Sequence, residues 1–364
     1  MSRRRLSLVI LLALALVVPP AGAQKGRITV PSGFHIDVFA PPLASARFMT
    51  LDPAGTLLVS LPRQGRVVAL PDADHDGRAD ATVTVADRLD RPHGLAFHEG
   101  HLYVAEMGAV KRFRYDPASR KASEGRVVVA NLPVGGNHVT RTVVFDREGG
   151  MFVSVGSSCN VCEERDRRRA AVVRYNADGS GESPFATGLR NAVGLAVHPI
   201  TGVLWATVNE RDWRGDDLPP DYITIVERGR FHGWPSCFAA GGKIVPDPDF
   251  KAGAERCGSM TLPTVEIQAH SAPLGLAFYT GRQFPAAYHG NLFVAYHGSW
   301  NRSVPTGYKI VRIPFTEGKP GRPEDFATGW ISGGLPGRPV DVLVAPDGAL
   351  FVSAEAIYRI TYRP

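Results

Sequence analysis

A sequence unit that recurs six times constrains the fold of this chain more than any other feature. Each copy begins with an apolar stretch, turns at Asp, Pro or Gly, and continues as a second stretch of alternating aromatic and aliphatic residues. Such a pair of stretches around a turn predicts a β-hairpin. The copies begin roughly 45 to 80 residues apart, at Phe48, His93, Arg141, Val193, Leu274 and Val340.

Most copies are followed by a third predicted strand. These strands are Arg66–Leu70, Val110–Tyr115, Ala171–Tyr175, Tyr222–Val226, Lys309–Ile313 and Ile357–Thr361. Three or four strands per unit, with almost no helical periodicity, are typical of propeller blades, which bury their faces by stacking around an axis. We therefore predict an all-β fold, a six-bladed β-propeller of four-stranded antiparallel blades. We expect the early strand His35–Phe39 to pair beside Ile357–Thr361 and close the ring. A β-sandwich or two separate sheets is the alternative.

The N-terminal segment resembles a cleavable signal peptide. Arg3–Arg5 precede the apolar run Leu6–Val18, and the small residues Ala21–Ala23 follow. We therefore expect a signal peptide over 1–23, a single propeller domain over 24–364, and a periplasmic or secreted protein without a membrane anchor. An uncleaved N-terminal anchor is the alternative. Removing three Arg lowers the formal charge from +6 to 6 − 3 = +3, which gives little reason to expect nucleic acid as a partner.

The four cysteines form two candidate disulfides in an exported chain. Cys237 and Cys257 flank a stretch rich in Gly, Pro, Lys and Asp, and we expect them to be bonded. Cys159 and Cys162 form Cys-Asn-Val-Cys, and Glu163 follows where covalent haem attachment requires His. A local disulfide is expected there, with a redox-active pair as the alternative.

An aspartate-rich segment, DADHDGRAD over residues 72–80, has carboxylates at alternate positions and Gly at the turn. A hard cation takes several oxygen ligands from a short loop of this kind. The pattern predicts a structural calcium site formed by Asp72, Asp74, Asp76 and Asp80. An Asp-rich turn that binds nothing is the alternative.

Polar residues stand directly before five of the inner strands. They are Pro92-His93, Asn137-His138, Arg190-Asn191, His270-Ser271 and Arg338-Pro339. Inner strands of a propeller end at the central channel, so these side chains are expected at one mouth. His138 follows Gly135 and Gly136 and is the candidate for taking a proton near neutral pH. A structural histidine is the alternative.

Cations from distant segments are expected to meet at this mouth. Arg190, Arg338 and either Arg302 or Lys309 come from different predicted blades. Their convergence indicates a ligand with several anionic groups, because Arg forks hold carboxylates well. Separate surface salt bridges are the alternative.

The loop over residues 209–222 carries more acidic and aromatic residues than a strand connection needs. Its carboxylates and carbonyls suit a metal ion beside the ligand. Trp213 and Tyr222 suit stacking on a planar ring or a sugar. A purely structural loop is the alternative.

Taken together, these residues resemble the soluble quinoprotein glucose/sorbosone dehydrogenase family over nearly the whole mature chain. The motifs that carry the resemblance are RPHGLAF, GGNH with VVFD behind it, GLRNAVGLA, NERDWRGDDLPPDY, GRFHGWP, AYHGSWNR and GRPVDVLVAPDG. The loop of Cys159 and Cys162 and the DDLPPDY run look closer to the sorbosone-type branch.

The resemblance implies an enzyme that holds pyrroloquinoline quinone (PQQ) and calcium at the mouth and oxidises a sugar or sugar aldehyde. Electrons would then pass to an external acceptor. His138 matches the family's catalytic base. Arg190 and Asn191 match the pair that contacts the quinone, with Arg190 also catalytic. Arg338 matches an arginine that binds a cofactor carboxylate.

The remaining site residues are also assigned through the resemblance. Arg302, or alternatively Lys309, matches a further basic cofactor contact, and we add His93 to this group. Glu210, Asp212 and Trp213 match the calcium loop, which acts partly through backbone carbonyls. Asp212-Trp213 replaces the Gly-Pro of glucose-oxidising members, and Val340 stands near the place of a second arginine.

Two other functions are compatible with the sequence. One is a calcium-dependent lactonase or hydrolase of propeller fold, in which the metal activates water. The other is a non-enzymatic propeller that binds carbohydrate or protein, because a fold alone does not establish activity. A monomer and a homodimer are equally compatible.

Overall fold

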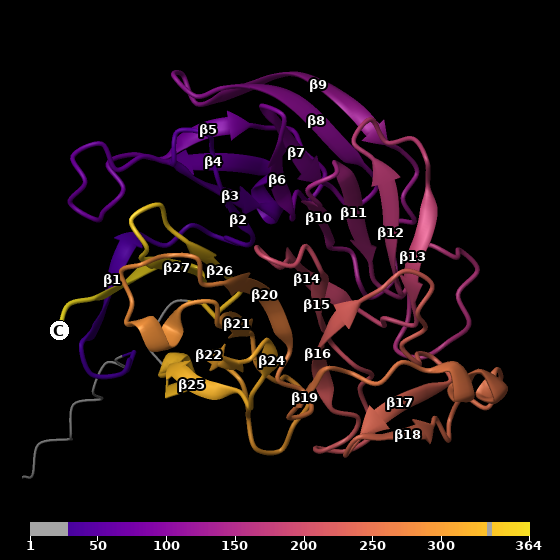
Figure 1. The fold of residues 1–364 in the computed structure, drawn as a ribbon. Coiled ribbons are helices and arrows are strands. Elements are labelled where there is room, and N and C mark those ends of the chain that lie inside the picture. Colours follow the sequence, from indigo (N-terminus) through magenta and orange to yellow (C-terminus); the bar gives the residue numbers. More distant parts are fainter. Residues whose placement is uncertain (1–27, 333–336) are drawn as a thin grey trace, which may run out of the picture.

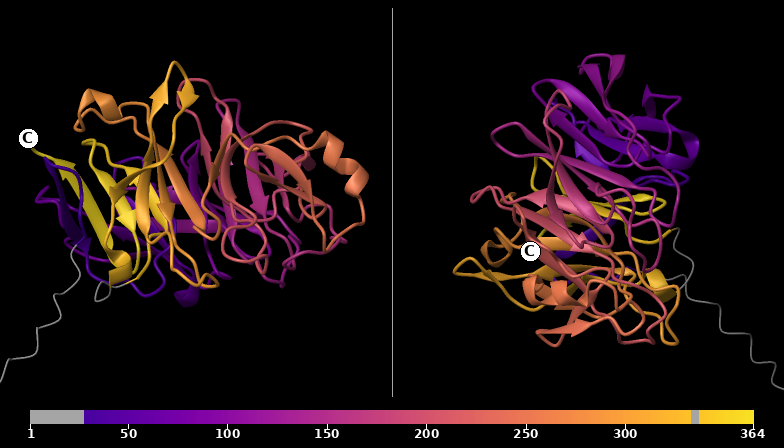
Figure 2. Two further views of the ribbon diagram at one scale, coloured as in Figure 1. Left: turned by 90° about the horizontal axis from the view of Figure 1, so that it is seen from below. Right: turned by 90° about the vertical axis from the view of Figure 1, so that its right-hand side faces the viewer.

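The computed structural model describes residues 28–332 and 337–364, which form six four-stranded antiparallel sheets around a central axis (Figure 1). This confirms the predicted six-bladed propeller. Side views show the sheets standing next to one another around the ring (Figure 2). The predicted signal peptide falls on residues outside the described ranges. Within those ranges, no helix has the length and hydropathy that a membrane span requires.

Blades 1 to 3 follow the chain order, each from the axis outward. Blade 1 contains β2 (Met49–Leu51), β3 (Leu57–Leu61), β4 (Arg66–Leu70) and β5 (Val83–Ala86). Blade 2 contains β6 (Leu95–His98), β7 (His101–Ala105), β8 (Val110–Asp116) and β9 (Lys121–Val129). Blade 3 contains β10 (Arg141–Phe145), β11 (Gly150–Val155), β12 (Ala171–Asn176) and β13 (Ser183–Thr187).

Blades 4 to 6 include insertions and the ring closure. Blade 4 contains β14 (Ala192–Val197), β15 (Leu204–Val208), β16 (Asp221–Val226) and β19 (Val265–Ile267). Blade 5 contains β20 (Pro273–Phe278), β21 (Leu292–Tyr296), β22 (Lys309–Ile313) and β25 (Glu324–Ala327). Blade 6 contains β26 (Asp341–Val344), β27 (Leu350–Ser353), β28 (Ile357–Tyr362) and β1 (Phe34–Ala40).

Short elements complete the fold. Two hairpins are formed by β17 (Cys237–Ala240) with β18 (Lys243–Pro246) and by β23 (Phe315–Thr316) with β24 (Lys319–Pro320). The 3-10 helices are η1 (Pro62–Gln64), η2 (Ala254–Ser259), η3 (Ala286–Tyr288) and η4 (Trp330–Ser332). Disulfides join Cys237 to Cys257 and Cys159 to Cys162, so both predicted pairs are confirmed.

The ring is closed by strands from the two ends of the chain. β1 pairs antiparallel with β28, and Phe34 lies opposite Tyr362, as predicted. Phe34 is buried and packs edge-on against Phe284, Phe326 and Tyr362. Because the first strand completes the last blade, neither blade 6 nor the ring is complete without both ends of the chain.

Glycine and hydroxyl residues allow neighbouring blades to approach closely at the axis. A Cβ on Gly94, in the first GLA motif, would lie 2.7 Å from the Cα of Thr142 in the next blade. The hydroxyls of Ser60 and Thr142 donate to the carbonyls of His93 and Val193, each on the following blade. The recurring GLA motif is therefore explained by close inter-blade packing. A small cluster of buried apolar residues packs between the blades: Phe48, Val193, Leu274 and Val340.

A buried aspartate joins blades 6 and 1 and gives a pH-dependent prediction. Asp341 is buried and accepts the backbone N–H of Met49 at 2.8 Å, and burial raises the pKa of its carboxyl to about 7. Because this pKa is raised above its unfolded value of about 4, its contribution to the free energy of unfolding is full below about pH 4 and is lost towards pH 7. Asp341→Asn keeps an acceptor and removes the ionisation. Its stability relative to the wild type should therefore rise across this range in thermal unfolding.

The control for this experiment is Asp37→Asn, because Asp37 lies exposed on β1. A stability difference for Asp341→Asn that stays constant from pH 4 to pH 7 would contradict the assignment.

Candidate functional site

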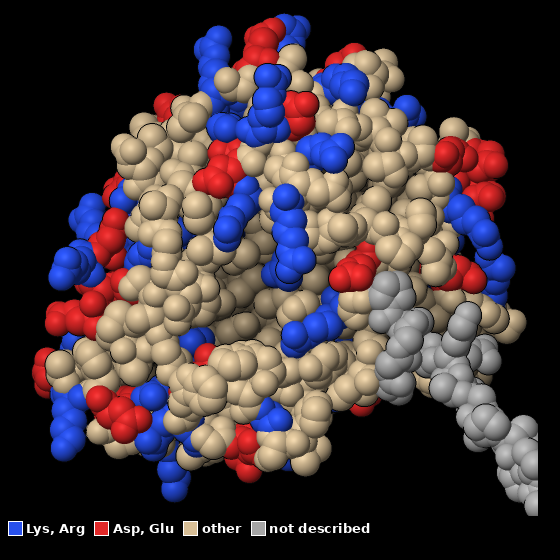
Figure 3. Space-filling model, turned by 180° about the vertical axis from the view of Figure 1, so that it is seen from behind, with Lys and Arg blue, Asp and Glu red and all other residues tan. Residues whose placement is uncertain are grey.

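The starts of the innermost strands lie on one face of the ring. The connections between second and third strands reach the same face, because neighbouring strands are antiparallel. Three of these connections are long and build up the face over blades 3, 4 and 5: residues 156–170, 209–220 and 297–308. The view from behind shows a hollow near the centre of the molecule with Lys and Arg side chains at its border (Figure 3).

Two adjoining cavities open among these loops. The larger cavity, of about 920 Å³, is lined mainly by blades 1, 2 and 6. The smaller cavity, of about 470 Å³, is lined mainly by blades 3, 4 and 5. Arg47, His297 and Arg338 line both, so the two cavities form one continuous mouth.

His138 lines the smaller cavity in a defined tautomer. Its Nδ1 lies 2.9 Å from both the carbonyl and the hydroxyl oxygen of Ser157. That hydroxyl donates its own proton to the carbonyl of Cys159, at 2.7 Å. Both oxygens of Ser157 therefore accept from His138, which places the proton on Nδ1 and leaves Nε2 as a base. Burial, reinforced by the charge of Arg190, lowers the pKa of His138 to about 3.

Two buried arginines hold the loop that carries His138. Arg141 donates to the carbonyls of His138 and Thr140, at 3.1 and 2.7 Å. Arg169 donates to the carbonyls of Val134 and Gly135, at 2.8 and 3.0 Å. These carbonyls lie on both sides of His138 in the chain. The two guanidinium groups therefore hold the backbone in place on both sides of this residue.

Arg190 is almost fully buried and braces the wall of the smaller cavity. It makes five hydrogen bonds, as many as a guanidinium has N–H groups. They go to the carbonyls of Asn160, Asn209 and Glu210 and to the side chains of Asn160 and Asp212. The next residue, Asn191, is 8% exposed and lines the same cavity. Arg190 therefore holds the connections 156–170 and 209–220 together, and it contributes positive charge to the cavity wall.

Three carboxylates line the smaller cavity beside Arg190. Asp212 bonds Arg190 at 3.1 Å and accepts the amide of Asn301 at 2.9 Å. Glu210 and Asp221 are 5% and 3% exposed. Burial raises the pKa of Glu210 to about 7 and that of Asp221 to about 6. Oε1 of Glu210 is buried without a hydrogen-bond partner among the described residues, and a cation would satisfy it.

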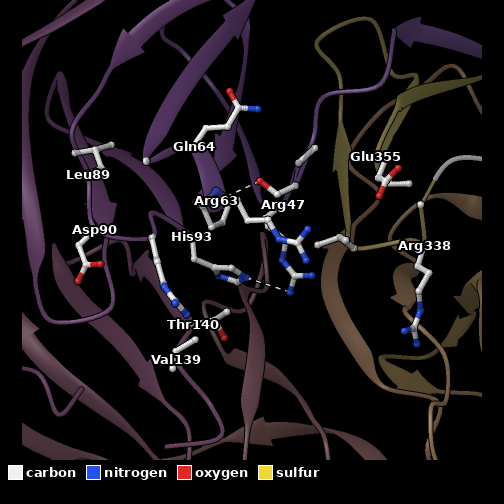
Figure 4. A pocket seen from close by; sticks show the side chains of 18 of the residues that line it. Arg47, Arg63, Gln64, Leu89, Asp90, His93, Val139, Thr140, Arg338 and Glu355 are labelled. Atoms are coloured by element: carbon white, nitrogen blue, oxygen red, sulfur yellow. Dashed lines mark hydrogen bonds between the residues drawn. The ribbon is translucent and has the colours of Figure 1, made fainter. Parts of the chain in front are cut away.

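Cationic and imidazole groups from several blades face the larger cavity. In Figure 4, Arg47, Arg63 and His93 gather on one side and Arg338 lies across from them. His93 is buried, and its Nε2 lies 3.5 Å from Arg47. Arg338 donates to the carbonyl of His297 at 2.8 Å and lies over the ring of Tyr308. Within the described part of the chain, neither Arg47 nor Arg338 forms an ion pair with a carboxylate.

Two predicted cationic contacts lie elsewhere. Arg302 bonds Asp217 at 3.0 Å and the carbonyl of Asp216. Lys309 bonds Asp325 at 2.5 Å. Neither lines the two cavities. Each side chain therefore has an acidic partner that lies near it in space. The partner of Arg302 is Asp217 in the connection 209–220, and the partner of Lys309 is Asp325 on the paired strand β25.

The predicted metal loops differ in how far their ligands converge. Oxygens of Asp72, Asp74 and Asp76 lie within 4.8 Å of one another, whereas Asp80 accepts the backbone N–H of Ala73. One oxygen of Asp72 is buried without a partner among the described residues. In the other predicted loop, Glu210 and Asp212 line the smaller cavity and the side chain of Trp213 is exposed.

Sequence reasoning missed Arg47 and His297, which line both cavities. Arg47 stands directly before Phe48, the start of the first repeat copy, so the rule applied to the other five copies would have found it. His297 lies in the AYHGSWNR motif. Its Nδ1 lies 2.8 Å from the carbonyl of Pro339, and burial together with Arg47 and Arg338 lowers its pKa to about 3.

Comparison with known proteins gives consistent matches. The TrAA12-like family model matches residues 28–360. A protein of Borreliella burgdorferi is 29% identical over 357 residues, covering 92% of this chain and 91% of its own. The pyrroloquinoline quinone-dependent pyranose dehydrogenase of Coprinopsis cinerea is 27% identical over 342 residues, covering 81% of this chain. The present chain spans about half of that relative, 46% of its length.

The fold also matches solved structures. The iodide structure of the Trichoderma reesei protein of Carbohydrate-Active Enzymes family AA12 superposes with a TM-score of 0.82 at 23% identity. The match covers 95% of this chain and all of the other, 100%. At that identity, the comparison establishes the propeller fold.

Proposed function

Because the chain belongs to the TrAA12-like family, we propose that it is a PQQ-dependent dehydrogenase that oxidises a sugar or sugar aldehyde. One observation carries the proposal: the smaller cavity contains both a histidine base and cationic groups that form no ion pair with a carboxylate among the described residues. The base is Nε2 of His138, and the cations are Arg47 and Arg338. A binding-only propeller would not need a base held in one tautomer.

The residues of the mouth fit a planar cofactor with several carboxylates. Arg47 and Arg338 line both cavities without a carboxylate partner among the described residues, so their charge is available to an anion. We assign them, with Asn191 and His93, to cofactor binding. Arg190 lines the smaller cavity with its N–H groups already bonded within the protein, and it adds positive potential there. When bound, the cofactor supplies a quinone that accepts the hydride of the substrate.

In this proposal, the residues of the chain position the substrate and move its proton. Nε2 of His138 takes the proton of the substrate hydroxyl, and Ser157 keeps Nδ1–H directed away from the substrate. Arg141 and Arg169 prevent the loop of His138 from moving during the transfer. Arg190, buried and unable to lose its proton, stabilises negative charge that develops nearby.

We also propose that calcium binds at two places. At the mouth, Glu210 and Asp212 would hold it together with the backbone carbonyl of Trp213, and the unpartnered Oε1 of Glu210 supports this. The second, structural calcium would lie between Asp72, Asp74, Asp76 and Asp80 on the opposite face, where the first three already converge. Calcium favours such oxygen ligands. The paired cysteines are consistent with function in the periplasm or outside the cell.

The experiment combines the mature chain with PQQ and calcium and follows reduction of an artificial electron acceptor over a panel of sugars. We expect a change in quinone absorbance, an increase in thermal stability and sugar-dependent turnover. Unchanged absorbance together with no thermal shift would exclude the dehydrogenase. Hydrolysis of lactones by the calcium-loaded chain without quinone would instead support a propeller hydrolase, in which buried carboxylates and metal activate water.

A further inference from the structure

Two exposed tryptophans meet at the rim of the smaller cavity. Trp213 and Trp300 are 68% and 65% exposed, whereas the remaining tryptophans, Trp205, Trp234 and Trp330, are 3%, 3% and 4% exposed. The two ring centroids lie 5.1 Å apart, with the ring planes at 86°. The chain therefore places an L-shaped aromatic corner in solvent at this rim.

The two tryptophans are next in the chain to residues that line the smaller cavity. Trp213 directly follows Asp212, and Trp300 directly precedes Asn301. The amide of Asn301 donates to Asp212 at 2.9 Å, which joins the two connections. Trp300 lines the smaller cavity together with His138. The aromatic corner is thus continuous with the place where the reaction is proposed to occur.

Folding alone does not account for this arrangement. Trp213 has φ of 68°, in the left-handed region that bulky residues rarely occupy and that carries a conformational cost. Its ring remains mostly in solvent and so gains little from hydrophobic burial. Two large rings that remain mostly in solvent at the rim of a cavity are best explained by a ligand that covers them.

The surroundings of the corner identify the kind of ligand. Charged and polar residues stand close to the two tryptophans in the chain: Asp212, Arg214 and Asp216 near Trp213, and Asn301 and Arg302 after Trp300. A pyranose matches this pattern, because its C–H faces pack on aromatic rings and its hydroxyls project from the edge toward polar groups. A protein partner would need a broader apolar surface than two rings.

We propose that Trp213 and Trp300 form a second sugar subsite, so that the substrate is an oligosaccharide. Its terminal unit would enter the smaller cavity and be oxidised, while the adjoining unit packs against the two rings. This inference rests on the proposed dehydrogenase function for the identity of the reacting unit. The subsite itself depends only on residues of this chain.

The first test measures binding without cofactor or turnover. The two exposed tryptophans contribute the emission that acrylamide quenches readily, because the other three are buried. We expect a trisaccharide to protect this emission from quenching in the cofactor-free chain, and the corresponding monosaccharide to protect it less. Trp300→Ala should abolish the protection, and Val304→Ala, an exposed change in the same connection, should preserve it.

The second test measures chain-length preference in the cofactor-loaded enzyme. We expect kcat/KM for a di- or trisaccharide to exceed that for the monosaccharide by about tenfold. Trp300→Ala should remove most of this preference through KM, and Trp300→Tyr should restore part of it. Monosaccharide turnover should fall less than oligosaccharide turnover, because the ring of Trp300 also lines the smaller cavity but packs mainly against the second unit.

The outcomes separate the subsite from the dehydrogenase. Sugar protection without PQQ-dependent turnover retains the subsite and rejects the dehydrogenase. Turnover with equal efficiency on mono- and oligosaccharides, and with no protection, rejects the subsite and retains the dehydrogenase. Protection by an apolar quinone but not by sugars would also overturn the proposal, because the corner would then bind an electron acceptor.

Discussion

Replacing His138 by alanine is expected to lower kcat of sugar oxidation by about two to four orders of magnitude while leaving the cofactor bound. His138 lines the smaller cavity, and hydrogen bonds to both oxygens of Ser157 leave Nε2 available. Its pKa, lowered to about 3 by burial and Arg190, keeps the imidazole neutral at neutral pH in the cofactor-free chain. A neutral imidazole is the form that can take the substrate proton.

The measurement compares steady-state turnover with cofactor occupancy read from quinone absorbance. His35→Ala is the matched control, because His35 is exposed on β1 in the outermost position of blade 6. His297 provides the competing assignment: it lines the same cavity, and its Nδ1 also faces a carbonyl, that of Pro339. Activity retained by His138→Ala but lost in His297→Ala would transfer the role of base to His297.

The fold was predictable where one physical pattern repeats. Strands with alternating or continuous apolar residues were located closely, and Arg66–Leu70 and Lys309–Ile313 coincide with β4 and β22. The outermost strand β1 was located as His35–Phe39, whereas the outermost strands of the other blades were not. β9 is the clearest example: most of its side chains are exposed and only Val129, its last residue, is buried.

The candidate site was predictable to the extent that position within a blade determines it. Residues directly before inner strands reach the mouth, so His93, His138, Arg190 and Arg338 all line the cavities. Arg47 obeys the same rule, because it stands directly before the first repeat copy, which begins at Phe48. The rule was applied to the other five copies and not to this one.

Contacts between long loops could not be predicted from the sequence. The pairing of Arg302 with Asp217 joins segments 85 positions apart in the chain, and no local pattern indicates it. The same holds for the bond from Asn301 to Asp212 and for the contact of Trp213 with Trp300. These contacts decide which polar groups are free to meet a ligand, and they follow from tertiary packing.

Replacing Arg47 or Arg338 by alanine is expected to raise the Kd of the cofactor roughly tenfold to one-hundredfold in each case, because a charge-assisted hydrogen bond contributes about 1.5–3 kcal/mol. Both arginines line both cavities, and no ion pair with a carboxylate occupies either among the described residues. Burial lowers the pKa of Arg47 to about 10, which still leaves it cationic at neutral pH.

Arg88→Ala is the matched control, because Arg88 borders the larger cavity but its side chain is 93% exposed and pairs with Asp87. Arg302→Ala and Lys309→Ala test the sequence-based assignments, and their pairing with Asp217 and Asp325 predicts little change in Kd.

The Kd of the cofactor would be measured by calorimetry at two salt concentrations, since the effects of exposed charges weaken with salt and those of buried charges persist. Loss of affinity in Arg302→Ala or Lys309→Ala, with wild-type affinity in Arg47→Ala, would show that the cofactor binds outside the two cavities. Full turnover of Arg47→Ala and Arg338→Ala at saturating cofactor would assign both arginines to binding, and a kcat that stays low would assign them to the reaction itself.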